Sequence, residues 1–424
     1  MRETRIIGRH TRLSVFAAAM GCSTFAAAHH GIANFDLNKD IEVAGVVTEI
    51  DFINPHSWVY IDVTNADGSV TPWRCELRGG TVLRRSGWTE EMFPAGMRIR
   101  ITGSPDRRDP TTCYTGTVFF PDGSSVDRYG QIDTPPRVDA DAPRAARRAN
   151  GDPNLAGDWA PNQLVMTDRR GQAGTLVPIT VADQFEPGEV PGGGQGFPGA
   201  RGTDLSFEED PVDTYWNRRG SALPLTEAGE AVLAGLDLTT EDNPRLRCAP
   251  TSIMFDWTFE QGVNRIEQTD TTVRLLYNSM GLDRTIHLDM GAHPDDIEPS
   301  VEGHSIGRWE DGTLVVDTVG FLPGMVTVDS RLPHGQGLHV VERFTLSDDA
   351  RSITREYMAE DPEYFTGQFT GRDVVYVADL PYSGTAPCED RTYRENDPSA
   401  AAMSAEPAEE EPDASWWMIW KWFD

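Results

Sequence analysis

Two stretches of this 424-residue chain alternate apolar and polar residues with a period of two, and this alternation is the feature that most constrains the fold. Successive side chains of a β-strand point to opposite faces, so the alternation predicts strands that bury one face. The first stretch has such segments at residues 43–52, 58–64, 71–77, 98–103 and 114–120. The second has them at 254–259, 263–268, 272–278, 284–288, 305–309, 314–319, 338–346, 353–358 and 374–377. We therefore predict a mainly β protein.

The order of the elements predicts two barrels. A short helix at 81–86 follows the third strand of the first stretch, which is the order of a five-stranded OB-like barrel, although small barrels of other topology fit the same order. The second stretch has about eight antiparallel strands joined mostly by short links. This arrangement predicts a lipocalin-like barrel, which can enclose one small ligand, with a β-sandwich as the alternative.

Changes in composition divide the chain further. Residues 1–28 form a signal peptide and 29–130 the first domain, whereas 131–150 are rich in Pro, Asp, Ala and Arg and predict a linker. The second domain spans 151–395 and includes a helix at about 226–236, with Thr226 as its N-cap and Gly235 at its end. An acidic linker, 396–414, leads to a Trp-rich tail at 415–424.

The N-terminus predicts export. Four arginines precede an apolar stretch at 13–25 that is too short to span a membrane, and Ala26-Ala27-Ala28 is a typical cleavage site. The alternative is a lipoprotein signal that ends at Cys22. Either signal places the mature protein in the periplasm or outside the cell.

The cysteines agree with export. Once Cys22 is removed, four remain, and an even number in an oxidising compartment predicts two disulfides. The sequence permits three pairings. The economical one joins Cys75 to Cys113 in the first domain and Cys248 to Cys388 in the second.

Charge and the tail suggest which partners the protein has. The formal net charge of −30 repels nucleic acid and favours the attraction of cations. The tail has four tryptophans within seven residues, which suits a membrane surface or a protein partner, and the alternative is packing onto its own barrel.

Histidines near the mature N-terminus suggest a metal site. Cleavage after Ala28 gives His29 a free amine beside its imidazole, and His30 adds a second ring. His56 in Asn-Pro-His-Ser-Trp is the candidate third ligand, and these donors suit copper or zinc. The alternative is a frayed terminus with His56 bonded to Asp51 or to backbone.

A second group of polar residues suggests acid–base chemistry. Alternation places His304, Ile306 and Arg308 on one strand face, and Asp317 and Glu342 lie among apolar residues on later strands. We expect these polar residues to share the interior of the second barrel, with His304 as the base and Asp317 as the group that orients it. The alternative is structural pairing of Arg308 or Arg343 with these carboxylates.

Several motifs of the first domain resemble a family of secreted bacterial proteins that carry a domain of unknown function. They are His29-His30-Gly31, Phe35-Asp36, residues 45–49, Asn54-Pro55-His56-Ser57-Trp58, Glu76-Leu77, 83–88 and 103–105, and the match covers residues 29–126. The remainder is similar to an uncharacterised partner region of such proteins, through motifs at 242–244, 248–250, 303–309, 314–318 and 341–344. The resemblance implies export and paired barrels, and it implies no particular reaction. The Trp-rich tail departs from the pattern.

Three functional hypotheses follow. The first is an exported binding protein for a small molecule or metal ion, with a histidine site at its N-terminus and a cavity in its second barrel. The second is a cofactor-free hydrolase or isomerase in the second barrel. The third is an envelope scaffold attached through its tail.

Overall fold

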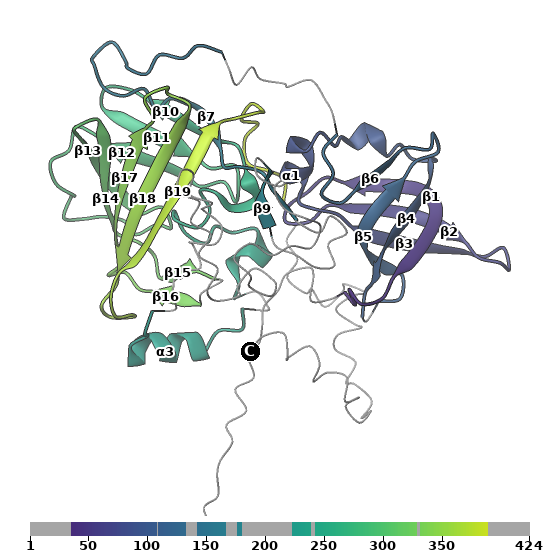
Figure 1. Ribbon diagram of the computed structural model, residues 1–424. Helices are drawn as coiled ribbons and strands as arrows, with labels where there is room; N and C mark the ends of the chain where they lie inside the picture. The colour runs from purple at the N-terminus through teal and green to yellow at the C-terminus, as the bar shows by residue number, and fades with distance from the viewer. Residues whose placement is uncertain are drawn as a thin grey trace, which may run out of the picture.

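The computed structural model describes residues 35–107, 109–132, 142–166, 176–179, 223–238, 242–328 and 331–388. Two β-barrels lie side by side, each around its own apolar core (Figure 1). The predicted fold, a mainly β protein with a small barrel followed by a larger one, is confirmed. Within the described ranges, no helix combines the length and the apolar composition needed to cross a membrane.

The small barrel has the strand order expected for an OB-like fold. Its strands run in the order β3-β2-β1-β4-β5, a parallel pairing of β3 with β5 closes the barrel, and the short β6 pairs with β5. Helix α1 lies between β3 and β4, as predicted. The elements are β1 (Ile41–Asp51), β2 (Trp58–Thr64), β3 (Val70–Glu76), α1 (Gly80–Arg85), a 3₁₀ turn (Glu90–Met92), β4 (Arg98–Pro105), β5 (Thr112–Phe119) and β6 (Ser125–Asp127).

The large barrel closes with nine strands in the order β10-β11-β12-β13-β14-β17-β18-β19-β7. Its strands are β7 (Gly157–Ala160), β10 (Asn264–Gln268), β11 (Thr272–Leu276), β12 (Asp283–His287), β13 (His304–Glu310), β14 (Thr313–Val319), β17 (His339–Leu346), β18 (Ser352–Glu360) and β19 (Phe369–Val377). The smaller elements of this domain are β8 (Leu164–Met166), β9 (Leu176–Pro178), α3 (Glu227–Ala234), two 3₁₀ turns (Pro244–Arg247 and Phe259–Gln261), β15 (Gly324–Thr327) and β16 (Leu332–His334). Thr226 caps α3 and Gly235 ends it, as predicted.

One pairing departs from an up-and-down barrel. β12 and β13 are parallel, with Ile286 opposite Ser305, and all other neighbouring strands in the large barrel are antiparallel. A parallel pair needs a connection that returns to the starting end of the sheet. Residues 288–303 make this connection, and they carry His293 to the end of the barrel where β13 begins.

The predicted strand at 254–259 is wrong. The segment forms turns and the start of a 3₁₀ turn, and its Trp257 packs against Tyr277 and Phe344 in the barrel core. The backbone carbonyls of Ile253 and Met254 accept hydrogen bonds from Arg355. An apolar run of this length has the same composition whether it forms a buried strand or a buried series of turns, and its periodicity does not distinguish the two.

Helix α1 of the small barrel packs against the large barrel. Its Arg85 donates to the carboxylate of Asp379 at 2.9 Å and to the carbonyls of Pro161 and Gln261 at 2.9 and 2.7 Å. A second contact joins Asn54, which precedes β2, to a segment that follows β19: the backbone N–H of Asn54 donates to the carbonyl of Pro387. Residues 142–150 of the predicted linker also contact the large barrel, where Arg148 pairs with Asp270.

Candidate functional site

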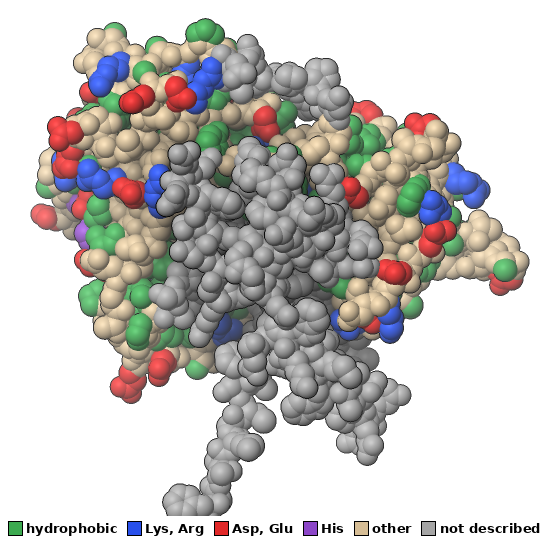
Figure 2. Space-filling model, viewed as in Figure 1, with side chains coloured by type: hydrophobic (Ala, Val, Ile, Leu, Met, Phe, Trp, Pro, Cys, Tyr) green, Lys and Arg blue, Asp and Glu red, His purple; other side chains and the backbone are tan. Residues whose placement is uncertain are grey.

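Histidine and carboxylate side chains gather on the outer face of the large barrel. Figure 2 shows histidines at the left edge of that barrel, where Figure 1 places β13 and β14. We call this group the outer histidine cluster, and its members are His287, His293, His304, Asp317, His339 and Glu360.

Hydrogen bonds connect the cluster in a chain. The Nδ1 atoms of His304 and His293 are 2.8 Å apart, and Nε2 of His293 lies 3.0 Å from Oδ1 of Asp317. The other oxygen of Asp317 lies 3.1 Å from Nε2 of His339, whose Nδ1 is 3.6 Å from Glu360. The ring of His287 stacks on His304 with centroids 5.3 Å apart.

Strand register explains why these residues meet. Ile306 lies opposite Asp317 and His304 opposite Val319, so His304 and Asp317 are diagonal neighbours on one sheet face. His339 lies directly opposite Glu360. Glycine is required just before His304, because Gly303 has φ +64° and a Cβ there would meet the Val319 carbonyl at 2.8 Å.

The surroundings shift two pKa values. Burial, and then electrostatic interaction with His293 and His287, lower the pKa of His304. Burial acts to raise the pKa of Asp317, but hydrogen bonds from His339 and His293 outweigh it and the pKa is lowered. At neutral pH the cluster therefore combines an ionised carboxylate with an uncharged His304.

The hydrogen bonds define the tautomers. Asp317 is ionised and can only accept, so Nε2 of His293 carries the proton of that hydrogen bond. The Nδ1 atoms of His293 and His304 share one proton between them. Such a chain can move a proton or present imidazole lone pairs to a cation. In the present arrangement, no group of three or more His, Cys, Asp or Glu side chains among the described residues is placed to hold a metal ion.

The structure brings His304 and Asp317 together, as predicted, but on the outside of the barrel and through His293. The expectation that Glu342 shares their face is wrong. Glu342 points into the barrel and is buried. Its neighbour Val341 lies opposite Asp317 on the outer face, and successive side chains of a strand alternate between the two faces. Its carboxylate lies 2.5 Å from Arg284 and 3.2 Å from Arg355.

The interior charges form a paired network. Arg355 also binds Asp373, and Arg284 donates to Ser305 and Thr318 at 2.8 Å each. Burial raises the pKa of Tyr277, beside this network, to about 12. Two cations and two anions balance within the buried core, which identifies this network as structural.

The alternative, in which Arg308 pairs with Asp317 or Glu342 and Arg343 pairs with Asp317, is also wrong. Both arginines contact Glu310, at 2.7 and 3.4 Å, on the exposed face of the barrel. Arg308 is therefore not part of the outer histidine cluster.

Sequence reasoning missed His287, His293, His339 and Glu360 as site residues. The signal for His293 was the length of its connection: the link between the predicted strands 284–288 and 305–309 was long and contained a histidine. The sequence does not predict that these strands pair in parallel. Only a parallel pairing requires the link to return along the barrel, and this return places His293 beside His304.

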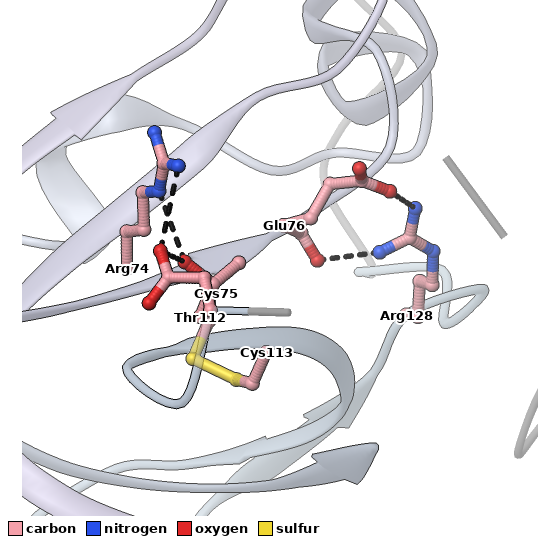
Figure 3. The surroundings of a disulfide bond; sticks show 7 residues. Arg74, Cys75, Glu76, Thr112, Cys113 and Arg128 are labelled. Atoms are coloured by element: carbon pink, nitrogen blue, oxygen red, sulfur yellow. Dashed lines mark hydrogen bonds and ion pairs between the residues drawn. A yellow bond between two sulfur atoms is a disulfide. The ribbon is translucent and has the colours of Figure 1, made fainter. Parts of the chain in front are cut away.

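In the small barrel, His56 faces Glu76, with Nδ1 3.4 Å from the carboxylate. Glu76 also binds the buried Arg128, whose guanidinium donates to the Glu76 carboxylate at 3.1 Å and to its carbonyl (Figure 3). His56 therefore has a carboxylate partner other than the expected Asp51. The predicted ligands His29 and His30 lie outside the described residues, as do the signal peptide and the Trp-rich tail.

Both predicted disulfides are present. Cys75 joins Cys113 where β3 and β5 pair in parallel (Figure 3), and Cys248 joins Cys388. The within-domain pairing is thus confirmed.

Comparison with known proteins tests the resemblance. No curated protein and no solved structure matches the chain. A family model described as "Family of unknown function (DUF6152)" matches residues 18–115. This match confirms the predicted resemblance of the N-terminal part of the chain to a domain of unknown function.

Proposed function

We propose that this chain is an exported binding protein whose outer histidine cluster binds a cation. The observation that carries the proposal is that three imidazoles and a carboxylate meet on one partly exposed face, connected by contacts of 2.8 to 3.1 Å. Export is supported by the N-terminal signal pattern and by two disulfides, which persist in oxidising compartments.

Charge supports the choice of a cation. The chain has a formal net charge of −30, which attracts cations. The carboxylates of Asp317 and Glu360 lie within the cluster, and the exposed Arg308 on β13 pairs with Glu310 instead of with these carboxylates. An approaching cation thus meets lone pairs and negative charge.

The outer face fits this role better than the interior. The described core of the large barrel is filled by apolar side chains, by Trp257 and by the buried arginine–carboxylate network. A small-molecule cavity in the second barrel remains a prediction. The N-terminal metal site at His29, His30 and His56 also remains a prediction, and its test must be kept apart from that of the cluster.

Equilibrium dialysis of the mature protein tests the proposal. The protein is dialysed against Mg²⁺, Ca²⁺, Mn²⁺, Co²⁺, Ni²⁺ or Zn²⁺ and the bound metal is measured. A His29→Ala/His30→Ala background removes the N-terminal donors. We expect at least one cation to bind stoichiometrically, and the triple variant His293→Ala/Asp317→Asn/His304→Ala to lose it. If no cation binds, or if binding is unchanged in that variant, the proposal is wrong.

The control is His56→Gln, which removes an imidazole from the other barrel. We expect its cation binding to equal that of the background protein. Loss of binding in this variant alone would move the site to the small barrel.

Acid–base catalysis at the same cluster is a second candidate, favoured by the continuous contact from Asp317 through His293 to His304. No hydrogen-bond partner of His304 Nε2 is found among the described residues, so within that part of the chain this nitrogen is not engaged in a hydrogen bond. An activated ester such as p-nitrophenyl acetate is the probe. Turnover that is lost in His304→Gln and reduced in Asp317→Asn supports catalysis, and turnover equal to that of free imidazole contradicts it.

A further inference from the structure

The two disulfides differ in their exposure to solvent. Cys75 and Cys113 lie in the core of the small barrel, and each is 0% exposed. Cys248 and Cys388 are both partly exposed. We propose that the Cys248–Cys388 bond is a site of reversible thiol–disulfide exchange, which an external dithiol reduces while the Cys75–Cys113 bond stays oxidised. None of the residues involved belongs to the outer histidine cluster, so cation binding does not enter the test.

The bond fixes the end of a segment that lies between the two barrels. We call this segment, residues 378–388, the strap; it follows β19 and runs from the large barrel toward the small one (Figure 1). Cys248 caps the 3₁₀ turn Pro244–Arg247 and lies 140 residues before Cys388 in the sequence. The disulfide therefore ties the end of the strap to a distant part of the large domain.

Hydrogen bonds to two asparagines also hold the end of the strap. The side chain of Asn278 donates to the Gly384 carbonyl at 2.7 Å, and its backbone carbonyl accepts from the Ala386 N–H at 2.8 Å. The Asn54 N–H donates to the Pro387 carbonyl at 2.8 Å. Every second residue from 381 to 387 is exposed. Once the covalent bond opens, water can compete for these hydrogen bonds.

The same two asparagines form a polar joint between the barrels. The hydroxyl of Thr81, in α1, donates to Oδ1 of Asn278 at 3.2 Å and accepts from Nδ2 of Asn54 at 3.1 Å. Both asparagines are buried. When the end of the strap moves away, Asn278 loses two hydrogen-bond partners and Asn54 loses one. Reduction of Cys248–Cys388 thus loosens the contact between the two barrels.

Reduction consumes one dithiol and transfers two electrons to the protein disulfide. A thiolate of the reductant attacks one sulfur, forms a mixed disulfide and releases the other cysteine as a thiolate, which takes up a proton. The second thiol of the reductant then attacks the mixed disulfide, loses its proton, and releases the second cysteine thiol. The products are two protein thiols and one oxidised dithiol. The exposed Arg247 precedes Cys248, and positive charge favours a thiolate as the leaving group.

Differential alkylation of the mature protein tests the site and needs no variant. The native protein is treated with dithiothreitol, quenched after set times and alkylated, and peptide mass spectrometry measures the reduced fraction of each cysteine. We expect Cys248 and Cys388 to be reduced at least about ten-fold faster than Cys75 and Cys113, because access controls the exchange rate. Oxidised glutathione should restore the bond. Equal rates, faster reduction of Cys75–Cys113, or failure to reoxidise would overturn the proposal.

Hydrogen exchange then measures the effect of reduction on the strap. We expect amides at 383–388 and at Asn54 to exchange faster in the selectively reduced protein, and the core strands β1 and β5 to be unchanged. Cys248→Ser/Cys388→Ser is the matched control: its exchange should equal that of the reduced wild-type protein, and dithiothreitol should change it no further. Unchanged exchange at 383–388 on reduction, or a dithiothreitol response that persists in the variant, would overturn the link between this bond and the strap.

Discussion

At the scale of single residues, the buried Glu342 is the centre of the interior charge network. Its carboxylate neutralises Arg284 and Arg355, and all three side chains are at most 1% exposed. Removing one partner of a buried pair leaves an uncompensated charge, which costs roughly 3–5 kcal/mol. We expect Glu342→Gln to lower the free energy of unfolding by that amount in urea denaturation. Glu310→Gln, which changes an exposed carboxylate that also contacts two arginines, should cost far less, because solvent screens its ion pairs. Similar losses in both variants would contradict the structural role of Glu342.

His334 gives the protein a defined pH dependence. Burial lowers the pKa of its imidazole, and the opposing effects of the Gly335 carbonyl and Asp361 are smaller. The folded state therefore binds this proton less readily than the unfolded state, whose histidine pKa is about 6.5. Stability should be fully present above that pH and fall as the pH drops through it, by at most about 1.4 kcal/mol per pH unit. His334→Gln should remove this part of the slope between pH 7.5 and 5, and an unchanged slope would contradict the assignment.

The residues of the candidate site were only partly predictable. His304 and Asp317 stood out because each is a polar residue among strand residues of alternating character. Alternation shows which residues share a face of a strand, but it does not show whether that face lies inside or outside the barrel. The sequence therefore places the outward-facing His304 and the inward-facing Glu342 in one predicted site. His293 lies on a connection without periodicity, so its position depends on the parallel pairing of β12 and β13.

At the scale of elements, helix α3 depends on its N-terminal cap. Thr226 accepts a hydrogen bond from the Gly229 N–H and donates to the carbonyl of Glu363, which attaches the helix to the segment after β18. Loss of such a cap costs about 0.5–2 kcal/mol. We expect Thr226→Ala to increase amide hydrogen exchange in α3 selectively, and Thr226→Ser to restore protection. Equal exchange in all three proteins would show that the cap does not limit opening of this helix.

Strands with clear alternation were predicted to within a few residues, and the errors have physical causes. The missed β7 is four residues long, and its role in closing the barrel comes from pairing with β10 and β19. The sequence predicts a strand at 254–259 because the apolar composition of this buried segment reflects its burial and not its conformation. Closure of the nine-stranded barrel thus depends on contacts distant in sequence, which local patterns do not contain.

At the scale of the whole molecule, helix α1 connects the two barrels through its contacts. Arg85 is nearly buried and donates to three acceptors of the large barrel: the Asp379 carboxylate and two backbone carbonyls. Hydrogen bonds to charged groups contribute about 1.5–3 kcal/mol each, and acceptors left buried without a donor add a further penalty. We expect calorimetry of the wild-type protein to show one cooperative transition, and Arg85→Ala to split it into two.

Arg84→Ala is the matched control, because Arg84 belongs to the same helix but bonds within the small barrel, to Glu90 and the Phe52 carbonyl. It should shift the transition without splitting it. Two transitions already in the wild-type protein would show that the barrels unfold independently and that the contacts of Arg85 do not couple them.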